Sequence, residues 1–253
     1  MQRRAATGGA SVLALILLAI AVYIGPETLI EKIDGGPRYV LALSWQPAFC
    51  EGNERKRECK SMTGTRFDAR HLSIHGLWPQ PGTNVYCGVS QALISADKQG
   101  RWQDIPEPKL SLATREALEL MMPGTQSLLD RHEWIKHGTC YRGGDAEAYF
   151  FDTVRLSAEI NSSAVREFLA AKIGKKVLAS DIRARFDEAF GPGAGERVRV
   201  ACDDDDGRQL IVELTIGLKG GIGAGTPVSE LIQASNPTES GCPGGIIDPV
   251  GFQ

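Results

Sequence analysis

The sequence lacks several patterns that mark common classes of metal-binding and redox protein. Its six cysteines include no CxxC pair, which zinc ribbons and thioredoxin-like sites both need. Its four histidines include no H-E-x-x-H motif, the signature of zinc proteases. No internal repeat and no long low-complexity linker divides the chain. Beyond residue 38 we therefore expect one domain.

Basic residues are not in excess either. The chain carries 28 Lys and Arg against 31 Asp and Glu, which gives a formal net charge of −3. A protein that grips long nucleic acid non-specifically usually has a basic surface. Such binding would here require the basic groups to be gathered at one cleft. The acidic run over 203–206 lacks the spaced ligands of a calcium loop, and we interpret it as a solvated turn.

The N-terminus differs from the rest of the chain. It reads MQRRAATGGASVLALILLAIAVYIG, two arginines followed by an apolar stretch over residues 11–25. That length suits the apolar region of a secretory signal and is short for a membrane span. Ala19-Ile20-Ala21 has the small-x-small form that a signal peptidase accepts. A signal peptide over 1–21 and a retained membrane anchor through 11–25 both remain open, and either predicts a secreted or periplasmic protein.

The cysteine count agrees with export. An even number of cysteines in an exported protein predicts structural disulfides. Six cysteines allow 15 pairings, and their spacing does not choose among them. The residues concerned are Cys50, Cys59, Cys87, Cys140, Cys202 and Cys242.

Apolar patterns predict strands at both ends of the chain and helices between them. Alternation predicts strands over 39–46 and 71–82 and a hairpin over 197–219. In the second strand of the hairpin, one face would hold Leu210, Val212, Leu214, Ile216 and Leu218. Helical patterns cover 111–122, 127–138, 145–160, 164–173 and 179–191. This order predicts an α+β fold with a central antiparallel sheet packed with several helices and stapled by disulfides.

The segment RHEWIKHGTC, residues 131–140, contains two of the four histidines. On a helix, Glu133 and His137 share one face, and His132 and Lys136 share the neighbouring one. The two histidines are five apart, roughly 140° around the helix, which is a poor geometry for one metal ion. Histidine, glutamate and lysine on adjoining faces suit proton transfer and the stabilisation of an anion.

The other two histidines lie in HLSIHGLWP. On a strand, His71, Ser73 and His75 would point the same way. His75 immediately precedes Gly76, where the strand would end and a site could open. A single histidine is commonly an ordinary core or surface residue. Two histidine-bearing segments, each followed by glycine, favour a functional site instead.

Together the two segments resemble the active-site segments of the ribonuclease T2 family, secreted endoribonucleases of the transferase type. The cores I-H-G-L-W-P and H-E-W-x-K-H-G-T-C match position for position, in order and about 60 residues apart. Weaker similarity extends over about residues 38–253, through LSWQPAFC, AYFFDTVRLSAEI and VRVAC. The resemblance implies that residues 38–253 form one ribonuclease catalytic domain.

The resemblance also implies a mechanism. The ribose 2′-hydroxyl attacks the adjacent phosphorus to form a 2′,3′-cyclic phosphate, which water opens to a 3′-phosphate. His137 would be the general base and His75 the general acid, and histidine suits both roles near neutral pH. Glu133 and Lys136 would stabilise the charged phosphorane, and His132 would hold the phosphate. No cofactor and no metal ion is implied.

The resemblance is less specific about the residues that bind the RNA bases than about the catalytic residues. Trp78 and Tyr86 suit stacking on an unpaired base, as is usual for single-stranded RNA, although each also suits core packing. Gln80 stands where many relatives carry an acidic or amide residue that reads the base, which leaves the base preference open. His71 has no role in the family and would be structural or at the surface. We expect a monomer that acts on single-stranded RNA and not on DNA.

The resemblance selects one pairing of the cysteines. It implies Cys50–Cys59, Cys87–Cys140 and Cys202–Cys242. The second bridge would join the loop after the first histidine segment to the end of the second, and so hold His75 near His137.

Two other functions remain open at this point. The chain could be an exported RNA-binding or partner-binding protein that keeps the fold without catalysis, although such a protein has no need of an acid and base pair. A metal-dependent phosphoesterase is a third alternative. The chemical ends formed on RNA would distinguish all three.

Overall fold

The computed structural model describes residues 38–252 with the exception of residue 143. The predicted signal peptide or anchor over 1–21 lies outside the described residues. Among the residues that are described, no helix is long and apolar enough to cross a membrane.

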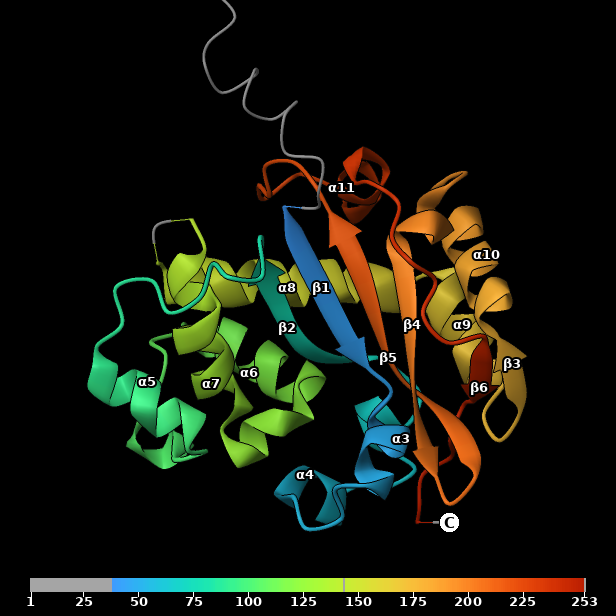
Figure 1. Cartoon of the computed structure of the whole chain (residues 1–253), viewed down its shortest axis with the longest axis horizontal. Coiled ribbons are helices and arrows are strands. Elements are labelled where there is room, and N and C mark those ends of the chain that lie inside the picture. The colour runs from blue at the N-terminus through green and yellow to red at the C-terminus, as the bar shows by residue number, and fades with distance from the viewer. Residues whose placement is uncertain (1–37, 143, 253) are drawn as a thin grey trace, which may run out of the picture. The chain divides into compact units, whose positions relative to one another are not determined.

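A six-stranded sheet forms the centre of the fold (Figure 1). Its strand order is β2-β1-β5-β6-β3, and β4 pairs with β5. The pairs β1–β2, β1–β5 and β4–β5 are antiparallel, as predicted, whereas β5 and β6 run parallel where Leu210 pairs with Ile246. The strands are β1 (Tyr39–Ser44), β2 (Ser73–Pro79), β3 (Lys176–Leu178), β4 (Val198–Asp205), β5 (Arg208–Leu218) and β6 (Gly244–Ile246).

Helices surround the sheet, and the longest of them, α8, crosses behind β1 and β2 in Figure 1. The helices are α3 (Gln46–Glu51), α4 (Arg57–Lys60), α5 (Gln91–Lys98), α6 (Leu112–Met121), α7 (Leu129–Lys136), α8 (Ala146–Asn161), α9 (Ala164–Ala171), α10 (Ala179–Phe190) and α11 (Val228–Ala234). Capping side chains explain where several of them begin. Ser111 accepts a hydrogen bond from the Thr114 amide at the start of α6, and Asp145 accepts one from the Glu147 amide at the start of α8.

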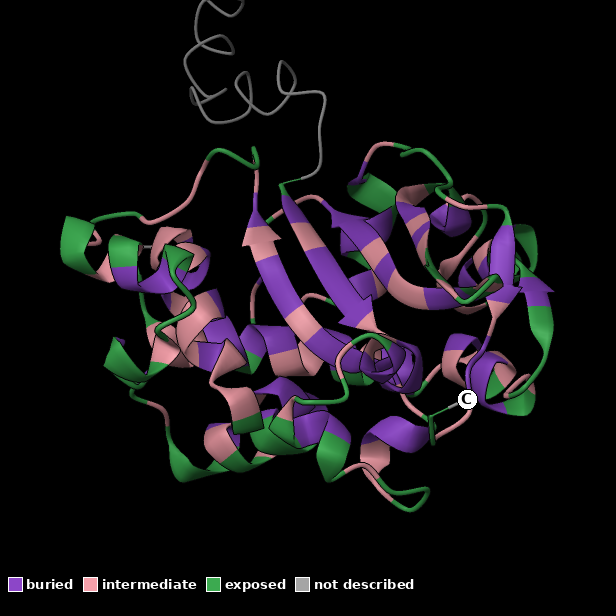
Figure 2. Ribbon diagram, turned by 60° about the horizontal axis from the view of Figure 1, so that its bottom comes forward, coloured by how far each residue is buried: buried purple, intermediate pink, exposed green. Residues whose placement is uncertain are grey.

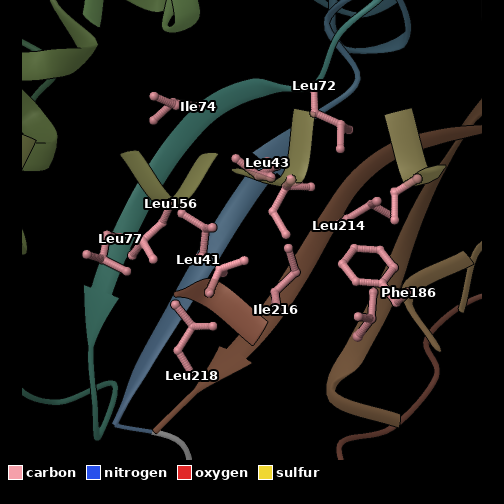
Figure 3. Packing of buried hydrophobic residues seen from close by; sticks show 14 of the residues in the cluster. Leu41, Leu43, Leu72, Ile74, Leu77, Leu156, Phe186, Leu214, Ile216 and Leu218 are labelled. Atoms are coloured by element: carbon pink, nitrogen blue, oxygen red, sulfur yellow. The ribbon is translucent and has the colours of Figure 1, made fainter. Parts of the chain in front are cut away.

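The core lies between the sheet and the layer formed by α8 and α10. Figure 2 shows buried residues along the strands and exposed residues on the outer turns of the helices. Alternate residues of β1 and β5 point into this core, where they meet Leu156 of α8 and Phe186 of α10 (Figure 3). The strand residues concerned are Leu41, Leu43, Leu214, Ile216 and Leu218. The opposite face of these strands is left for polar groups.

The predicted elements and the observed ones agree closely for the long segments. Every helix predicted from periodicity is present with each end within two residues of the predicted one. The helix predicted over 127–138, for example, begins at Leu129 and ends at Lys136. The strand predicted over 71–82 begins only at Ser73. His71 therefore precedes the strand, where it stacks on Phe67, and it does not share a strand face with His75 as predicted.

Two register shifts interrupt the regular alternation. Between β1 and β2, Ala42 pairs with Gly76 and Leu43 pairs with Ile74, which leaves His75 as the extra residue of a bulge. Between β4 and β5, Val212 is the extra residue. Val212 is accordingly only partly buried and lines a cavity, in contrast to its predicted place among the core residues of β5. Bulges commonly redirect a side chain beside a functional site.

Three disulfides tie the loops to this scaffold. They join Cys50 to Cys59, Cys87 to Cys140 and Cys202 to Cys242, the pairs that the family resemblance implies. The structure has no free cysteine among its described residues. The second bridge connects the loop after β2 to the turn after α7, and so joins the two histidine segments.

Candidate active site

His75 projects from the bulge in β2 toward the end of α7. A regular strand would place His75 and Trp78 on opposite faces, because side chains alternate along it. The bulge removes that constraint. The two rings meet edge to face with their centroids 5.1 Å apart. The side chain of His75 is 37% exposed, so it remains accessible from solvent.

His137 lies at the C-terminal end of α7, where Gly138 follows. A β-carbon at Gly138 would lie 2.4 Å from the Trp134 ring, so this glycine allows the helix end to pack closely. The ring of His137 is tilted against that of Trp78, with 5.6 Å between centroids. Trp78 therefore lies against both histidines. The Nδ1 atom of His137 is buried and has no hydrogen-bond partner among the described residues.

Glu133 is the central group of the site. Its side chain is only 1% exposed, and its Oε2 accepts a hydrogen bond of 2.9 Å from Nε1 of Trp78. Its Oε1 lies 3.8 Å from Nε2 of His75 and 3.7 Å from Nε2 of His132. The carboxylate thus touches both histidine segments at once.

Gly76 makes this approach of α7 to β2 possible. A β-carbon built at Gly76 would lie 2.0 Å from Oε2 of Glu133 and 2.6 Å from Nε1 of Trp78. Real atoms do not approach so closely. The glycine of the I-H-G-L-W-P segment is therefore required by packing, since the space beside it is filled by the Trp78–Glu133 hydrogen bond.

Asp97 of α5 connects His132 to Tyr86. Its Oδ1 lies 2.7 Å from Nδ1 of His132, and its Oδ2 accepts a hydrogen bond of 2.7 Å from the Tyr86 hydroxyl. Trp102 stacks on the His132 ring at 4.9 Å. Each of these contacts fixes the orientation of the His132 imidazole, whose Nε2 then faces Glu133.

Glu213 of β5 reaches His75 from the other side. Its Oε2 lies 2.6 Å from Nδ1 of His75, a short charge-assisted contact when the imidazole is protonated. The two residues are 138 positions apart in the chain. The pair therefore exists only because the sheet brings β2 and β5 to either side of β1.

The surroundings shift the pKa values of the two central histidines in opposite directions. Burial lowers the pKa of His137, and the nearby positive charges of Lys136 and His132 add to this effect, so that it falls to about 3. Burial also lowers the pKa of His75, but the hydrogen bond to Glu213 and the charge of Glu133 outweigh it, and the pKa is raised. One histidine is thus kept neutral and the other is favoured as the cation. Opposite shifts in a neighbouring pair are the usual sign of a base and an acid.

A cavity of about 350 Å³ opens beside His75 on the Glu213 side. Aromatic rings from two segments, Phe49 and Trp102, line it together with the ammonium group of Lys56. This ammonium lies 5.9 Å from the Phe49 ring centre and 5.6 Å from that of Trp102. His137 does not line this cavity. The cavity therefore lies next to His75 and not next to His137.

The structure brings most of the residues expected in the site together. His75, His132, Glu133 and His137 surround one point, and Lys136 is close enough to affect the charge of three of them. Trp78 is packed between the histidines. The more distant candidates are tied to this group by hydrogen bonds. Tyr86 donates its backbone N–H to the Lys136 carbonyl and its hydroxyl proton to Asp97, and Gln80 donates to the Trp78 carbonyl.

Two residues of the site were missed in the sequence. Asp97 lies in a helix, α5, that the apolar pattern did not predict, and it gives no signal of its own. Glu213 could have been noticed, because it is the single charged residue inside the apolar run LIVELTIGL. A charge in the middle of a central strand needs a partner.

The chain is similar to known ribonucleases in sequence and in fold. The model of the Ribonuclease T2 family matches residues 36–229. Ribonuclease I of Escherichia coli (strain K12) is 36% identical over 204 residues, which cover 72% of this chain and 75% of that protein.

Solved structures show the same fold. Actibind, described as a T2 ribonuclease, superposes with a TM-score of 0.51 at 18% identity, over 87% of this chain and 90% of that one. The self-incompatibility associated SF11-RNase of Nicotiana alata gives 0.50, also at 18% identity, over 72% and 85% of the two chains.

The packing at Gly76 generates a prediction. Replacing Gly76 by alanine should separate Glu133 from Trp78, because the added methyl group occupies the place of their hydrogen bond. Overpacking of this kind destabilises proteins by roughly 1–3 kcal/mol. We expect a lower free energy of unfolding in urea and a loss of RNA cleavage.

Gly52→Ala is the matched control, because nothing lies within 4 Å of an added β-carbon there. If Gly76→Ala matched this control in both stability and cleavage, the close approach of α7 to β2 would not exist as described.

Proposed function

The chain belongs to the Ribonuclease T2 family and is an endoribonuclease, and from this premise we propose that it cleaves single-stranded RNA without a metal ion. The first product would be a 2′,3′-cyclic phosphate, which water opens to a 3′-phosphate. The observation that carries this proposal is the pair of histidines with opposite pKa shifts that both lie against the ring of Trp78.

His137 is the general base in this proposal. Its pKa of about 3 keeps the imidazole neutral at ordinary pH, so it can accept the proton of the ribose 2′-hydroxyl. The bond that forms joins the 2′-oxygen to phosphorus. An incoming phosphate would place negative charge beside His137 and favour the imidazolium that results.

His75 is the general acid. Its raised pKa favours the protonated form, which donates to the 5′-oxygen as the bond between phosphorus and that oxygen breaks. His75 then holds no proton on that nitrogen and can act as base when water attacks the cyclic phosphate.

The remaining polar groups would stabilise the negative charge of the phosphate and orient the histidine rings. Lys136 would stabilise the extra negative charge that the phosphorane carries, and His132 would hold a phosphate oxygen with Nε2 while Asp97 fixes its Nδ1. The buried carboxylate of Glu133 lies near Nε2 of both His75 and His132, and it would keep these two imidazole rings oriented.

The cavity beside His75 suits the leaving nucleoside. The acid must reach the leaving 5′-oxygen, so the nucleoside that carries this oxygen has to lie on the His75 side. The cavity there is of a size that binds small molecules, and the Phe49 and Trp102 rings give it an apolar wall that suits a base. Trp78, Tyr86 and Gln80 would contact the base on the other side of the phosphate. We propose that the protein acts as a monomer.

The first test concerns the histidines. His75→Ala and His137→Ala should each reduce RNA cleavage by roughly 10²–10⁴-fold, the usual contribution of a general acid or base. Glu133→Gln should reduce it less, because it carries no obligatory proton. Cleavage of a defined oligonucleotide is measured beside circular dichroism of each variant.

His71→Ala serves as the control, since His71 stacks on Phe67 outside the site. Near wild-type cleavage by a folded His75 or His137 variant would refute the role proposed for that histidine. Absence of cleavage by the wild-type protein would instead favour a protein that binds RNA without cutting it.

The second test separates this mechanism from metal-dependent ones. The nucleophile belongs to the substrate and both proton carriers are side chains, so excess EDTA should leave the rate unchanged. DNA of the same sequence should resist cleavage, and one 2′-deoxyribose should block cleavage at that linkage alone. End-group analysis should find 2′,3′-cyclic or 3′-phosphate and 5′-hydroxyl ends. Loss of activity in EDTA, or 5′-phosphate ends, would contradict the proposal.

The third test concerns location. We propose that residues 1–21 direct the protein to the periplasm or out of the cell, because two arginines precede an apolar stretch that ends in Ala19-Ile20-Ala21. N-terminal sequencing of the mature protein should then begin near Val22. An intact N-terminus in the membrane fraction would show an anchor, and a cytoplasmic pool would contradict both alternatives.

A further inference from the structure

We propose that Glu213 is a positioning residue for the general acid: its carboxylate holds Nδ1 of His75 so that Nε2 presents the proton to the leaving oxygen. This inference rests on the proposed function, because it assigns a partner to the acid of that mechanism. Glu213 itself touches neither the phosphate nor the 2′-hydroxyl.

The architecture of the sheet allows the contact. β2 and β5 lie on either side of β1, so their backbones are separated by about two strand spacings, roughly 9–10 Å. Long side chains can meet across that distance if the strand between them carries small ones. On this face β1 presents Ala42 and Ser44, and Ser44 lines the cavity with His75 and Glu213.

Both strands depart from regular pairing at this point. His75 is the extra residue of the bulge in β2, and Val212, next to Glu213, is the extra residue of the bulge in β5. Each bulge redirects the side chain at or beside it. The result is an Nδ1–Oε2 distance of 2.6 Å between strands that do not pair with each other.

Glu213 has no competing partner among the described residues. Within the described part of the chain, His75 provides the only side-chain hydrogen bond and the only ion pair of Glu213, whose side chain is 19% exposed. A partly buried carboxylate at the centre of a sheet is costly unless a charge compensates it. Pairing with a protonated His75 supplies that charge, so Glu213 and the acid form of His75 stabilise each other.

Other charges around His75 do not replace this contact. Glu133 lies on the Nε2 side, at 3.8 Å, and is shared with His132. Lys136 acts against protonation of His75. The titratable groups that face His75 or line its cavity come from three parts of the fold. They are Glu213 on β5, His132, Glu133, Lys136 and His137 on α7 and its end, and Lys56 and Glu58 at the start of α4.

The contact with Glu213 determines which proton of His75 is transferred in the reaction, namely the one on Nε2. While the ring is protonated, Nδ1–H is bonded to Glu213 and Nε2–H points toward the site. In the cleavage step the Nε2–H bond breaks, the proton joins the 5′-oxygen, and the phosphorus–oxygen bond breaks with its electron pair on that oxygen. The neutral ring retains its proton on Nδ1, where Glu213 continues to accept it.

The experiment compares Glu213→Gln with the wild type on two substrates. One is a dinucleotide, whose leaving alkoxide needs a proton. The other is a nucleoside 3′-(4-nitrophenyl phosphate), whose leaving group departs without one. We expect Glu213→Gln to lower kcat on the dinucleotide by roughly tenfold to a hundredfold, less than the full contribution of the general acid, and to change kcat on the activated ester little.

The pH profile gives a second readout. Activity requires protonated His75, so kcat/KM falls as the pH rises through the pKa of His75. Removal of the Glu213 charge lowers that pKa, and the alkaline limb should move to lower pH by about one unit or more. Glu213→Asp, which keeps the charge on a shorter side chain, should restore part of both effects. Glu230→Gln on α11 removes the same charge from an exposed position and is the control.

The outcomes separate this proposal from the one on which it rests. If His75→Ala loses cleavage of both substrates equally, the acid assignment itself fails. If His75→Ala spares the activated ester while Glu213→Gln behaves like the wild type, the acid stands and the role of Glu213 is refuted. An equal loss on both substrates in Glu213→Gln, with an unmoved alkaline limb, would show a merely structural residue.

If the variants do not fold, a measurement on the wild-type protein tests whether Glu213 holds the proton on Nδ1 of His75. Nitrogen NMR of His75 above its pKa should show the proton on Nδ1. A neutral ring protonated on Nε2 would overturn the proposal.

Discussion

The carboxylate of Glu133 lies almost fully buried between the two histidine segments, and the rest of the site is arranged around it. Burial raises the pKa of Glu133, while the charges of His75 and His132 and the Trp78 hydrogen bond act in the opposite direction. A buried carboxylate without such partners would cost several kcal/mol. The partners are present because Gly76 admits the side chain against the backbone of β2. The position of the Glu133 carboxylate therefore depends on the absence of a β-carbon at residue 76.

The opposite states of the two histidines follow from where their negative neighbours lie. His75 has a carboxylate on each side, Glu213 at Nδ1 and Glu133 near Nε2. His137 has a buried Nδ1 without a hydrogen-bond partner among the described residues and positive groups nearby. Identical side chains 62 positions apart thus have pKa values shifted in opposite directions. The roles proposed for them depend on these neighbours more than on the motifs that contain them.

The sequence predicts what periodicity and local motifs encode. The helices α6, α8, α9 and α10 and the hairpin of β4 and β5 follow from apolar spacing, and their caps mark where several of them begin. The two motifs identify the catalytic candidates. Helix α5 has the same length as α9 but fewer apolar residues, and β6 has only three residues, so neither was predicted. The bulges were missed for another reason: they arise from pairing between distant strands, which alternation within one strand does not contain.

The same limit explains why Asp97 and Glu213 could not be assigned roles. Each acts through a contact with a residue far away in the chain, 35 positions for Asp97 and His132 and 138 for Glu213 and His75. The motif residues come from two segments, and their supporting carboxylates come from two others. A local pattern can therefore identify the groups that react and still omit the groups that set their protonation and orientation.

The loop after β2 and the end of α7 are joined by three separate attachments. The Cys87–Cys140 disulfide is covalent, the Tyr86 amide bonds to the Lys136 carbonyl, and the Tyr86 hydroxyl bonds to Asp97, which also holds His132. One attachment alone would leave the loop free to rotate about it. Together the three attachments fix Tyr86 relative to α7. A base held by this loop would therefore keep its phosphate at a constant distance from His132 and His137, which is the requirement for in-line attack by the neighbouring 2′-hydroxyl.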